Sequence, residues 1–166
     1  KLWEGMYFLG AGYLYQGLLD KGRTALIKYC NILDGEKDEN LIKLHEPVRL
    51  SAQLLIGQSY INQSSFYEAI DVYKKLIEEK SDIIEAYLNA GYSYFCIGDV
   101  EASKEMFIKL LDFKPDNVLA LNNLGFLEMH ERNLEVAKNY FLKAIEVSSD
   151  YPLPYVNLGF IFTIEG

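Results

Sequence analysis

A period of 34 residues runs through the chain and limits the folds that it can adopt. Shifting the sequence by 34 aligns four glycines: Gly57, Gly91, Gly125 and Gly159. Twelve positions after a glycine the same shift aligns small residues: Ala69, Ser103 and Ala137. Four positions further on it aligns aromatic residues: Tyr73, Phe107 and Phe141. Self-similarity at one fixed spacing is typical of architectures in which one supersecondary unit stacks on the next.

Each period predicts two helices joined by a tight turn. The apolar and small residues of its first half recur at i, i+3, i+4 and i+7, as on one face of a helix: Tyr87, Ala90, Gly91 and Tyr94. A break at Gly98 separates this segment from a second stripe that contains Phe107 and Leu110, and Pro115 ends it. The period therefore indicates an antiparallel pair of helices.

This pattern resembles the tetratricopeptide repeat family. The resemblance rests on the period, the glycine, the small and aromatic residues that follow it, and Pro115, although Arg132 replaces a turn glycine. It covers three full repeats at 50–83, 84–117 and 118–151, and residues 152–166 as the first helix of a further, truncated repeat. It implies an all-α fold, a right-handed α-solenoid of stacked antiparallel helix pairs, with at least nine helical segments and no sheet.

The same resemblance implies that the four aligned glycines lie where the two helices of a pair cross closely. A side chain at such a crossing would push the helices apart, so closer packing must offset the ~1 kcal/mol by which glycine disfavours a helix. We expect the aligned small residues, Ala69, Ser103 and Ala137, to face these glycines.

Residues 1–49 follow the repeat less regularly. Ala11–Tyr15 (AGYLY) is similar to Ala90–Tyr94 (AGYSY), which predicts that Gly12 is a repeat glycine. A degenerate helix pair then fits only with one residue inserted at 20–22. Residues 34–46 are acidic and are interpreted as a surface loop, with a contact loop for a partner as the alternative.

Charge and hydropathy argue against nucleic acid and membranes as partners of this chain. A net charge of −8 argues against nucleic acid and against an anionic membrane surface. No apolar run approaches the ~20 residues of a membrane span. The sequence starts at Lys1 and ends within an unfinished repeat, so we interpret it as a fragment of a longer protein. The cytoplasm is weakly favoured, and an extracytoplasmic location requires a signal or anchor upstream.

The residues that usually carry catalysis or bind metals lack the necessary spacing. His45 and His130 have no metal-ligand partners at ligand spacing, and no phosphate-binding loop or nucleophile motif is present. Cys30 and Cys96 are expected to be buried or half-buried, with a disulfide between them left open. We therefore expect neither an enzyme nor a cofactor.

The first helices of the pairs are expected to line a concave groove, with two ladders on its surface. One ladder consists of asparagines (Asn89, Asn123 and Asn157) and the other of aromatic residues (Tyr92, Phe126 and Phe160), which Tyr13 extends if Gly12 is aligned correctly. The candidate peptide-binding residues are Asn89, Tyr92, Phe95, Asn122, Asn123, Phe126, Met129, Asn157 and Phe160. In the alternative interpretation, the asparagines cap or bridge neighbouring helices and the aromatic rings belong to the core.

The resemblance implies a protein-interaction module. Asparagines at these places in the family often hold the backbone of an extended peptide. A carboxylate clamp needs Lys or Arg on the inner surface, and the candidate positions hold none. An apolar or aromatic segment of a partner protein is therefore the expected ligand. The alternative is a structural solenoid segment of a larger assembly, which self-associates through its inner face or through residues 152–166.

Overall fold

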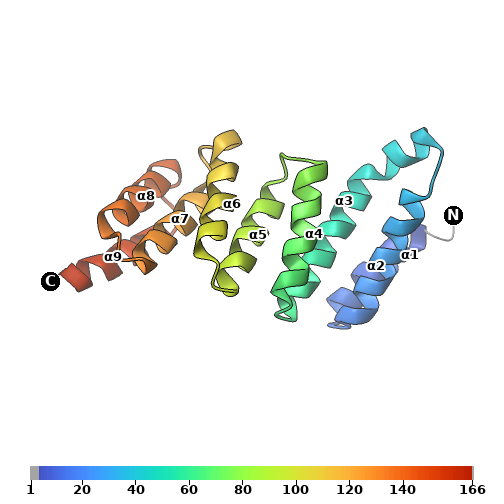
Figure 1. The fold of residues 1–166 in the computed structure, drawn as a ribbon, viewed down its shortest axis with the longest axis horizontal. Helices are drawn as coiled ribbons and strands as arrows, with labels where there is room; N and C mark the ends of the chain where they lie inside the picture. Colours follow the sequence, from blue (N-terminus) through green and yellow to red (C-terminus); the bar gives the residue numbers. More distant parts are fainter. Residues whose placement is uncertain (1–3, 166) are drawn as a thin grey trace. The chain divides into compact units, whose positions relative to one another are not determined.

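The computed structural model describes residues 4–165, and over these residues the chain forms nine α-helices and no strand. The helices are α1 (Glu4–Tyr15), α2 (Leu19–Asp34), α3 (Glu39–Asn62), α4 (Phe66–Glu79), α5 (Ile84–Cys96), α6 (Val100–Phe113), α7 (Val118–His130), α8 (Leu134–Val147) and α9 (Leu153–Glu165) (Figure 1). The predicted all-α fold of successive helix pairs is confirmed.

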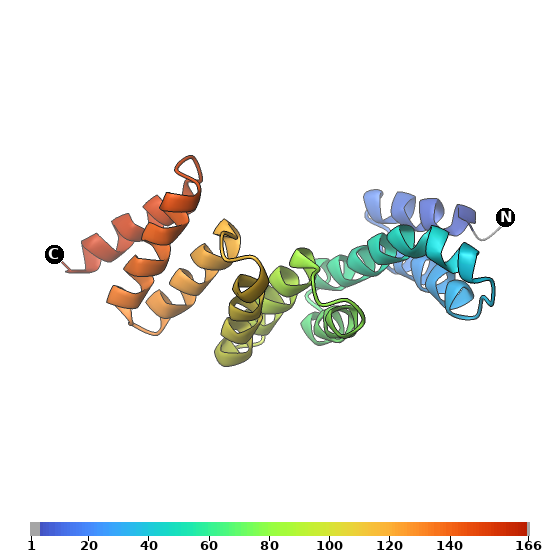
Figure 2. The same ribbon diagram turned by 90° about the horizontal axis from the view of Figure 1, so that it is seen from above.

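The chain divides into two compact units whose boundary lies inside α5, between residues 89 and 90. In the first unit α1 packs against α2, α2 against α3, and α3 against α4 (Figures 1 and 2). In the second unit α6 packs against α7, α7 against α8, and α8 against α9. Within each unit these helices thus contact their neighbours along the chain, as in a repeat protein.

The helix pairs cross closely at three of the four aligned glycines, as predicted. A Cβ added to Gly57 would lie 2.4 Å from Cζ of Tyr73. At Gly91 and Gly125 it would lie 2.6 Å from a ring carbon of the aromatic residue sixteen positions later, Phe107 or Phe141. These separations are far shorter than van der Waals contact, so the glycines are required for the packing.

One detail of that prediction is wrong, at Gly159. At the other three glycines the aromatic rings lie nearest to an added Cβ, and the small residues Ala69, Ser103 and Ala137 are fully buried. Of these three, Ser103 does reach its glycine, because its hydroxyl donates a hydrogen bond of 2.7 Å to the Gly91 carbonyl. Gly159 has nothing within 4 Å of an added Cβ, because a ring sixteen positions after it would lie beyond residue 166.

The first helix pair follows the same spacing from Gly10, so the predicted alignment on Gly12 is wrong. A Cβ on Gly10 would lie 2.7 Å from Cγ of Leu26, sixteen positions later, while one on Gly12 would meet nothing. Gly22 takes the place of the small residue, and its Cβ would lie 2.8 Å from the Gly10 carbonyl oxygen. No inserted residue is needed. We propose on this spacing that residues 4–34 form a repeat-like pair, in which Tyr13 lies outside the ladder.

The turns inside four helix pairs share one backbone conformation. Seven positions after the glycine of the crossing, φ is positive: 76° at Gly17, 58° at Ser64, 83° at Gly98 and 68° at Arg132. Residues with a side chain disfavour this left-handed region by roughly 1–2 kcal/mol. The turn nevertheless adopts this conformation in all four helix pairs, even where the residue is Arg132.

The acidic insertion is mostly helical, so its interpretation as a loop over 34–46 is wrong. Only residues 35–38 lie outside helices, and α3 begins at Glu39. The Asp38 carboxylate caps this helix by accepting hydrogen bonds from the backbone N–H groups of Asn40 (3.0 Å) and Leu41 (3.3 Å). An aspartate N-cap followed by Glu39 in the first turn favours a helix start, which the charge-based interpretation overlooked.

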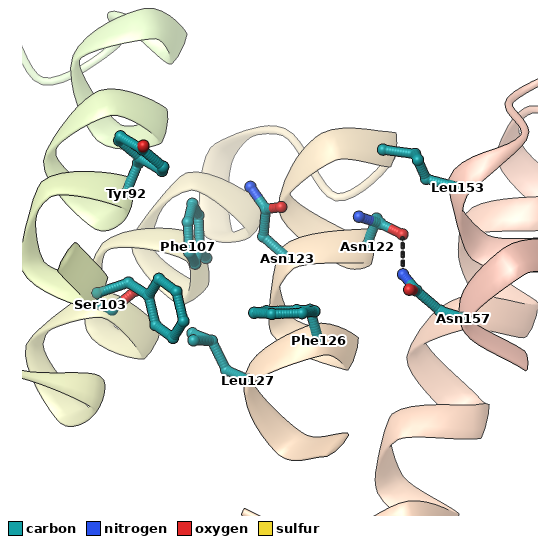
Figure 3. Close-up of a pocket in the computed structure, with 10 residues that line it drawn as sticks. Tyr92, Ser103, Phe107, Asn122, Asn123, Phe126, Leu127, Leu153 and Asn157 are labelled. Carbon is teal, nitrogen blue, oxygen red and sulfur yellow. Dashed lines mark hydrogen bonds between the residues drawn. The ribbon is translucent and has the colours of Figure 1, made fainter. Parts of the chain in front are cut away.

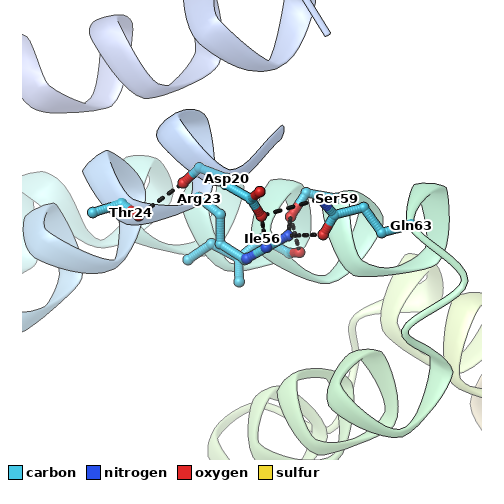
Figure 4. A network of polar contacts seen from close by, with 6 residues as sticks. All are labelled: Asp20, Arg23, Thr24, Ile56, Ser59 and Gln63. Carbon is cyan, nitrogen blue, oxygen red and sulfur yellow. Dashed lines mark hydrogen bonds and ion pairs between the residues drawn. The ribbon is translucent and has the colours of Figure 1, made fainter. Parts of the chain in front are cut away.

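A polar network holds the first helix pair on α3 (Figure 4). Arg23 of α2 pairs with Asp20 and donates hydrogen bonds to Gln63 Oε1 (2.7 Å) and to the buried Ser59 hydroxyl (3.2 Å). Its guanidinium also lies 4.2 Å from the ring centroid of Tyr60. One arginine therefore combines hydrogen bonds with a cation–π contact across the two helices.

Candidate functional site

A pocket of about 390 Å³ opens in the second unit, among α5, α6, α7 and α9 (Figure 3). Ten residues line it: Tyr92, Phe95, Ser103, Phe107, Asn122, Asn123, Phe126, Leu127, Leu153 and Asn157. None of the ten is charged. Three of them are asparagines, and most of the others are aromatic or aliphatic.

Aromatic rings make up one side of the pocket. The rings of Phe95 and Phe126 meet edge to face with 5.5 Å between their centroids, and Phe95 also meets the His130 ring at 5.9 Å. The Tyr92 side chain is half exposed, and a side-chain hydrogen bond with Cys96 raises the pKa of its hydroxyl. Edge-to-face packing fixes the ring planes, so this side presents a preformed apolar surface.

Asparagine amides form the opposite side. Asn157 of α9 donates from Nδ2 to Oδ1 of Asn122 in α7, at 3.1 Å. Asn122 is only 5% exposed, and its Nδ2 is directed away from Asn157 toward the pocket (Figure 3). Asn123 is half-buried, and its amide projects into the same space. The pocket therefore combines an apolar side with a side that can donate and accept hydrogen bonds.

Six of the nine predicted site residues line this pocket: Tyr92, Phe95, Asn122, Asn123, Phe126 and Asn157. Three do not. Asn89 belongs to the first unit, where burial raises the pKa of Tyr73 and a side-chain hydrogen bond with Asn89 opposes that shift. Met129 packs on the buried cluster around Phe141, and Phe160 lies 56% exposed on α9. Two asparagines of the ladder, Asn89 and Asn157, thus bond to other side chains of the chain.

Sequence reasoning missed four lining residues. Ser103 and Phe107 lie on α6, a second helix, and were interpreted only as packing residues of the crossing. Leu127 is buried next to Phe126 in the chain, and Leu153 begins α9. The Phe107 ring packs on Gly91, so the aligned glycine was the signal that places this ring against the first helix.

Two lysines of the second unit are paired with carboxylates. Lys104 of α6 binds Glu128 of α7 at 2.7 Å and also Glu131, which follows that helix. Burial lowers the pKa of Lys104, but the hydrogen bonds to the two glutamates outweigh it and raise that pKa overall. One period later, Lys138 of α8 binds Glu165 of α9 at 2.6 Å. These ion pairs join α6 to the C-terminal end of α7, and α8 to α9.

The remaining features concern metal binding, the two cysteines and membrane-spanning helices. The described residues hold no group of three or more His, Cys, Asp or Glu side chains suited to a metal ion. Both cysteines are free thiols: Cys30 is buried, which raises its pKa to about 11, whereas Cys96 is exposed, contrary to expectation. Among the helices of residues 4–165, none has the length and apolar character needed to cross a membrane.

Several solved structures share this fold. A tetratricopeptide repeat protein from Parabacteroides merdae superposes with a TM-score of 0.81 at 18% identity, over 96% of this chain and 58% of that one. YrrB, described as a TPR protein with an unusual peptide-binding site, gives 0.71 at 17% identity, over 90% of this chain and 71% of its own. The first TPR of Spaghetti (RPAP3), bound to an HSP90 peptide SRMEEVD, gives 0.65 at 18%, over 69% of this chain and 91% of its own.

The chain thus spans less than two thirds of the Parabacteroides protein, and no curated protein sequence matches it. The sequence model of the tetratricopeptide repeat family matches residues 50–83, 84–117 and 118–151. These matched segments contain the three glycine–aromatic crossings of the structure. The chain belongs to the tetratricopeptide repeat family.

Proposed function

We propose that this chain is a protein-interaction module that binds an extended, apolar or aromatic peptide segment of a partner protein in the groove that contains the pocket. Tetratricopeptide repeats generally mediate protein–protein interactions and are generally scaffold modules rather than enzymes. The observation that carries the proposal is the preformed pocket, which sets aromatic rings opposite asparagine amides with no charge between them.

The composition of the pocket suits an uncharged peptide segment. Its rings offer contact area to a large apolar side chain, whose burial contributes ~1.5–3 kcal/mol. Its amides offer a donor and an acceptor to peptide groups, at ~0.5–1.5 kcal/mol for each hydrogen bond. A micromolar complex needs ~8 kcal/mol, so the peptide must extend beyond the pocket. The exposed Val156 and Phe160 of α9 offer further apolar area in the same unit.

An acidic peptide is a poorer match. The structure of the Spaghetti TPR holds a peptide that ends in Glu-Glu-Val-Asp. Here Lys104 and Lys138 are engaged by glutamates, and the lining holds neither Lys nor Arg. Burying an uncompensated carboxylate costs several kcal/mol. We therefore propose an apolar ligand segment and no carboxylate clamp.

A selection experiment tests this proposal. Peptides are selected from a random display library on the whole chain, and their affinities are measured by fluorescence anisotropy. Phe126→Ala is expected to weaken the selected peptides about tenfold or more, because it removes one ring of the apolar side. Tyr67→Ala, an exposed aromatic residue on α4, is the matched control and should leave the affinities unchanged. Equal affinities for the Phe126→Ala variant and the unsubstituted chain would refute the proposal.

A second candidate function is a structural segment that self-associates through α9. Six large apolar side chains on this helix are exposed: Leu153, Tyr155, Val156, Phe160, Phe162 and Ile164. A face of this size is more typical of an interface than of a free surface. We expect concentration-dependent association in analytical ultracentrifugation, weakened by Phe162→Lys but not by Ile108→Lys on α6. A monomer at every concentration would exclude this function.

A further inference from the structure

Asn122 is a polar side chain in an unusual position. It is 5% exposed and lies next to the buried Leu121, one turn before the ring that fills the pocket wall at Phe126. Burying an amide costs free energy unless its donors and acceptors are paired. The side chain has two donor hydrogens and two acceptor lone pairs, so its hydrogen bonds can be accounted for one by one.

Only one side of this amide has a partner. Its Oδ1 accepts the 3.1 Å hydrogen bond from Asn157 Nδ2. Its Nδ2 is directed into the pocket (Figure 3), and no acceptor for it is found among the residues that the structure describes. The Asn122 side chain as a whole is nearly buried, but its Nδ2 is not sealed from the pocket, so an acceptor supplied from outside the chain can reach it there.

Asn157 determines which way the amide of Asn122 points. Because Oδ1 must face the Asn157 donor on α9, Nδ2 must face the opposite side, where the pocket lies. The hydrogen bond thus fixes the orientation before any ligand arrives, which lowers the entropic cost of binding. Asn157 acts in this arrangement as a positioning residue, while Asn122 makes the contact.

The sequence shows that Asn122 departs from the repeat. The corresponding positions of the other repeats hold Leu54, Leu88 and Val156, which are all apolar. An apolar side chain here would serve packing alone. The asparagine is therefore not required by the repeat framework, whereas the ladder asparagines recur in it.

The neighbouring groups restrict the chemistry of the acceptor. The aromatic side formed by Phe95, Phe107 and Phe126 requires an apolar group close to the acceptor. A carboxylate would lack a cation, because none lines the pocket. A neutral carbonyl beside a bulky apolar side chain satisfies both conditions, and a peptide backbone supplies this pair at every large apolar residue.

We propose that Asn122, oriented by Asn157, donates a hydrogen bond to the backbone carbonyl of a ligand residue whose aromatic or bulky aliphatic side chain occupies the pocket. This inference rests on the proposed function and deepens it, because it names the contacting donor and the anchoring residue of the peptide. The main polar contact with the peptide is then made by Asn122, whose equivalents in the other repeats are apolar, and not by the asparagines of the ladder.

Two small probes test the inference on the whole chain by nuclear magnetic resonance. N-acetyl-L-phenylalanine methylamide carries the ring and the carbonyls, while ethylbenzene carries the ring alone. The diamide is expected to shift the side-chain NH₂ signals of Asn122 downfield, and ethylbenzene to perturb only signals around Phe126. The Asn122 signals are identified by their loss in Asn122→Asp. Equal shifts of these signals with both probes, or no binding of either, would overturn the inference.

Substitutions give an independent readout with the peptides selected above. Asn122→Asp keeps the size and the acceptor for Asn157 but removes both donors, so affinity should fall about tenfold. Asn157→Ala frees the amide to turn and should cost about two- to threefold. Asn31→Asp on the exposed side of α2 adds the same charge elsewhere and should change nothing. Unchanged affinity in Asn122→Asp would overturn the inference.

The inference and the proposed function fail separately. Selected peptides that respond to Phe126→Ala but not to Asn122→Asp leave the proposed function intact and remove Asn122 from it. Peptides that respond to neither substitution remove both. If Asn122→Asp melts at a much lower temperature, the two-probe experiment on the unsubstituted chain decides the inference alone.

Discussion

Replacing Gly125 by alanine tests the physical basis of the helix crossing. The new Cβ would lie 2.6 Å from Cε1 and 2.8 Å from Cδ1 of Phe141, whose ring is fully buried. Overpacking of this kind costs ~1–3 kcal/mol. Alanine recovers ~1 kcal/mol of helix propensity, so the net destabilisation is roughly 0–2 kcal/mol.

Gly159 provides the matched control because it holds the same place in the period with nothing within 4 Å of an added Cβ. Gly159→Ala should therefore gain the propensity of ~1 kcal/mol without the clash. The two variants are compared by urea unfolding followed by circular dichroism. Gly159→Ala is expected to be more stable than Gly125→Ala by ~1–3 kcal/mol. Equal stabilities would show that the glycines are not selected by the aromatic rings that cover them.

Three further predictions concern the turn, the cap and the ion pairs. Arg132→Gly should raise the free energy of unfolding by up to ~1 kcal/mol, because glycine accepts the φ of 68° without strain but loses more entropy on folding; a decrease in chemical denaturation would contradict this. Asp38→Ala should cost ~0.5–2 kcal/mol and increase amide exchange at Asn40 and Leu41, which lose the cap; unchanged exchange would contradict this. Desolvation raises the pKa of Glu128, but the hydrogen bonds with Lys104 and Asn133 and the charge of Lys104 together outweigh it and hold that pKa below the usual 4.5. The unfolded chain therefore takes up this proton first as the pH falls, so the stabilisation is present above pH 4.5 and is lost as the pH falls further. Lys104→Met should flatten that part of the stability profile, and an unaltered profile would show that the ion pair contributes nothing.

The sequence predicts most of the framework because packing repeats with the period. The three crossings at Gly57, Gly91 and Gly125 follow from alignment alone, since each needs a residue without a side chain under a ring. The first helix pair was misaligned because the resemblance of AGYLY to AGYSY outweighed the spacing from Gly10 to Gly22 and Leu26. There an aliphatic side chain replaces the ring, so the aromatic signal is missing.

The start of α3 shows a different limit. Residues 34–40 (DGEKDEN) are mostly charged, as in a surface loop, and this charge was used to interpret the segment. Such a segment becomes a helix when a capping residue precedes it and an apolar stripe continues from it. Asp38 is the capping residue here, and Ala52 and Ile56 belong to the apolar stripe. A single capping residue thus decided a structure that charge could not predict.

The candidate site was predictable in its location but not in the roles of its residues. Alignment identifies the surface of the first helices, and six of the nine predicted residues do lie around one pocket. Alignment also favours whatever recurs, so it gave the asparagine ladder priority over Asn122. In the structure, two of the recurring asparagines bond to other side chains of the chain, Asn89 to Tyr73 and Asn157 to Asn122. A residue that the repeat framework does not require can be specialised for a ligand. A polar residue at a buried position that is apolar in the other repeats costs folding free energy, and packing does not explain why it is there. Departures from the period at buried positions are therefore the better sequence signal for a binding residue in a chain of this kind.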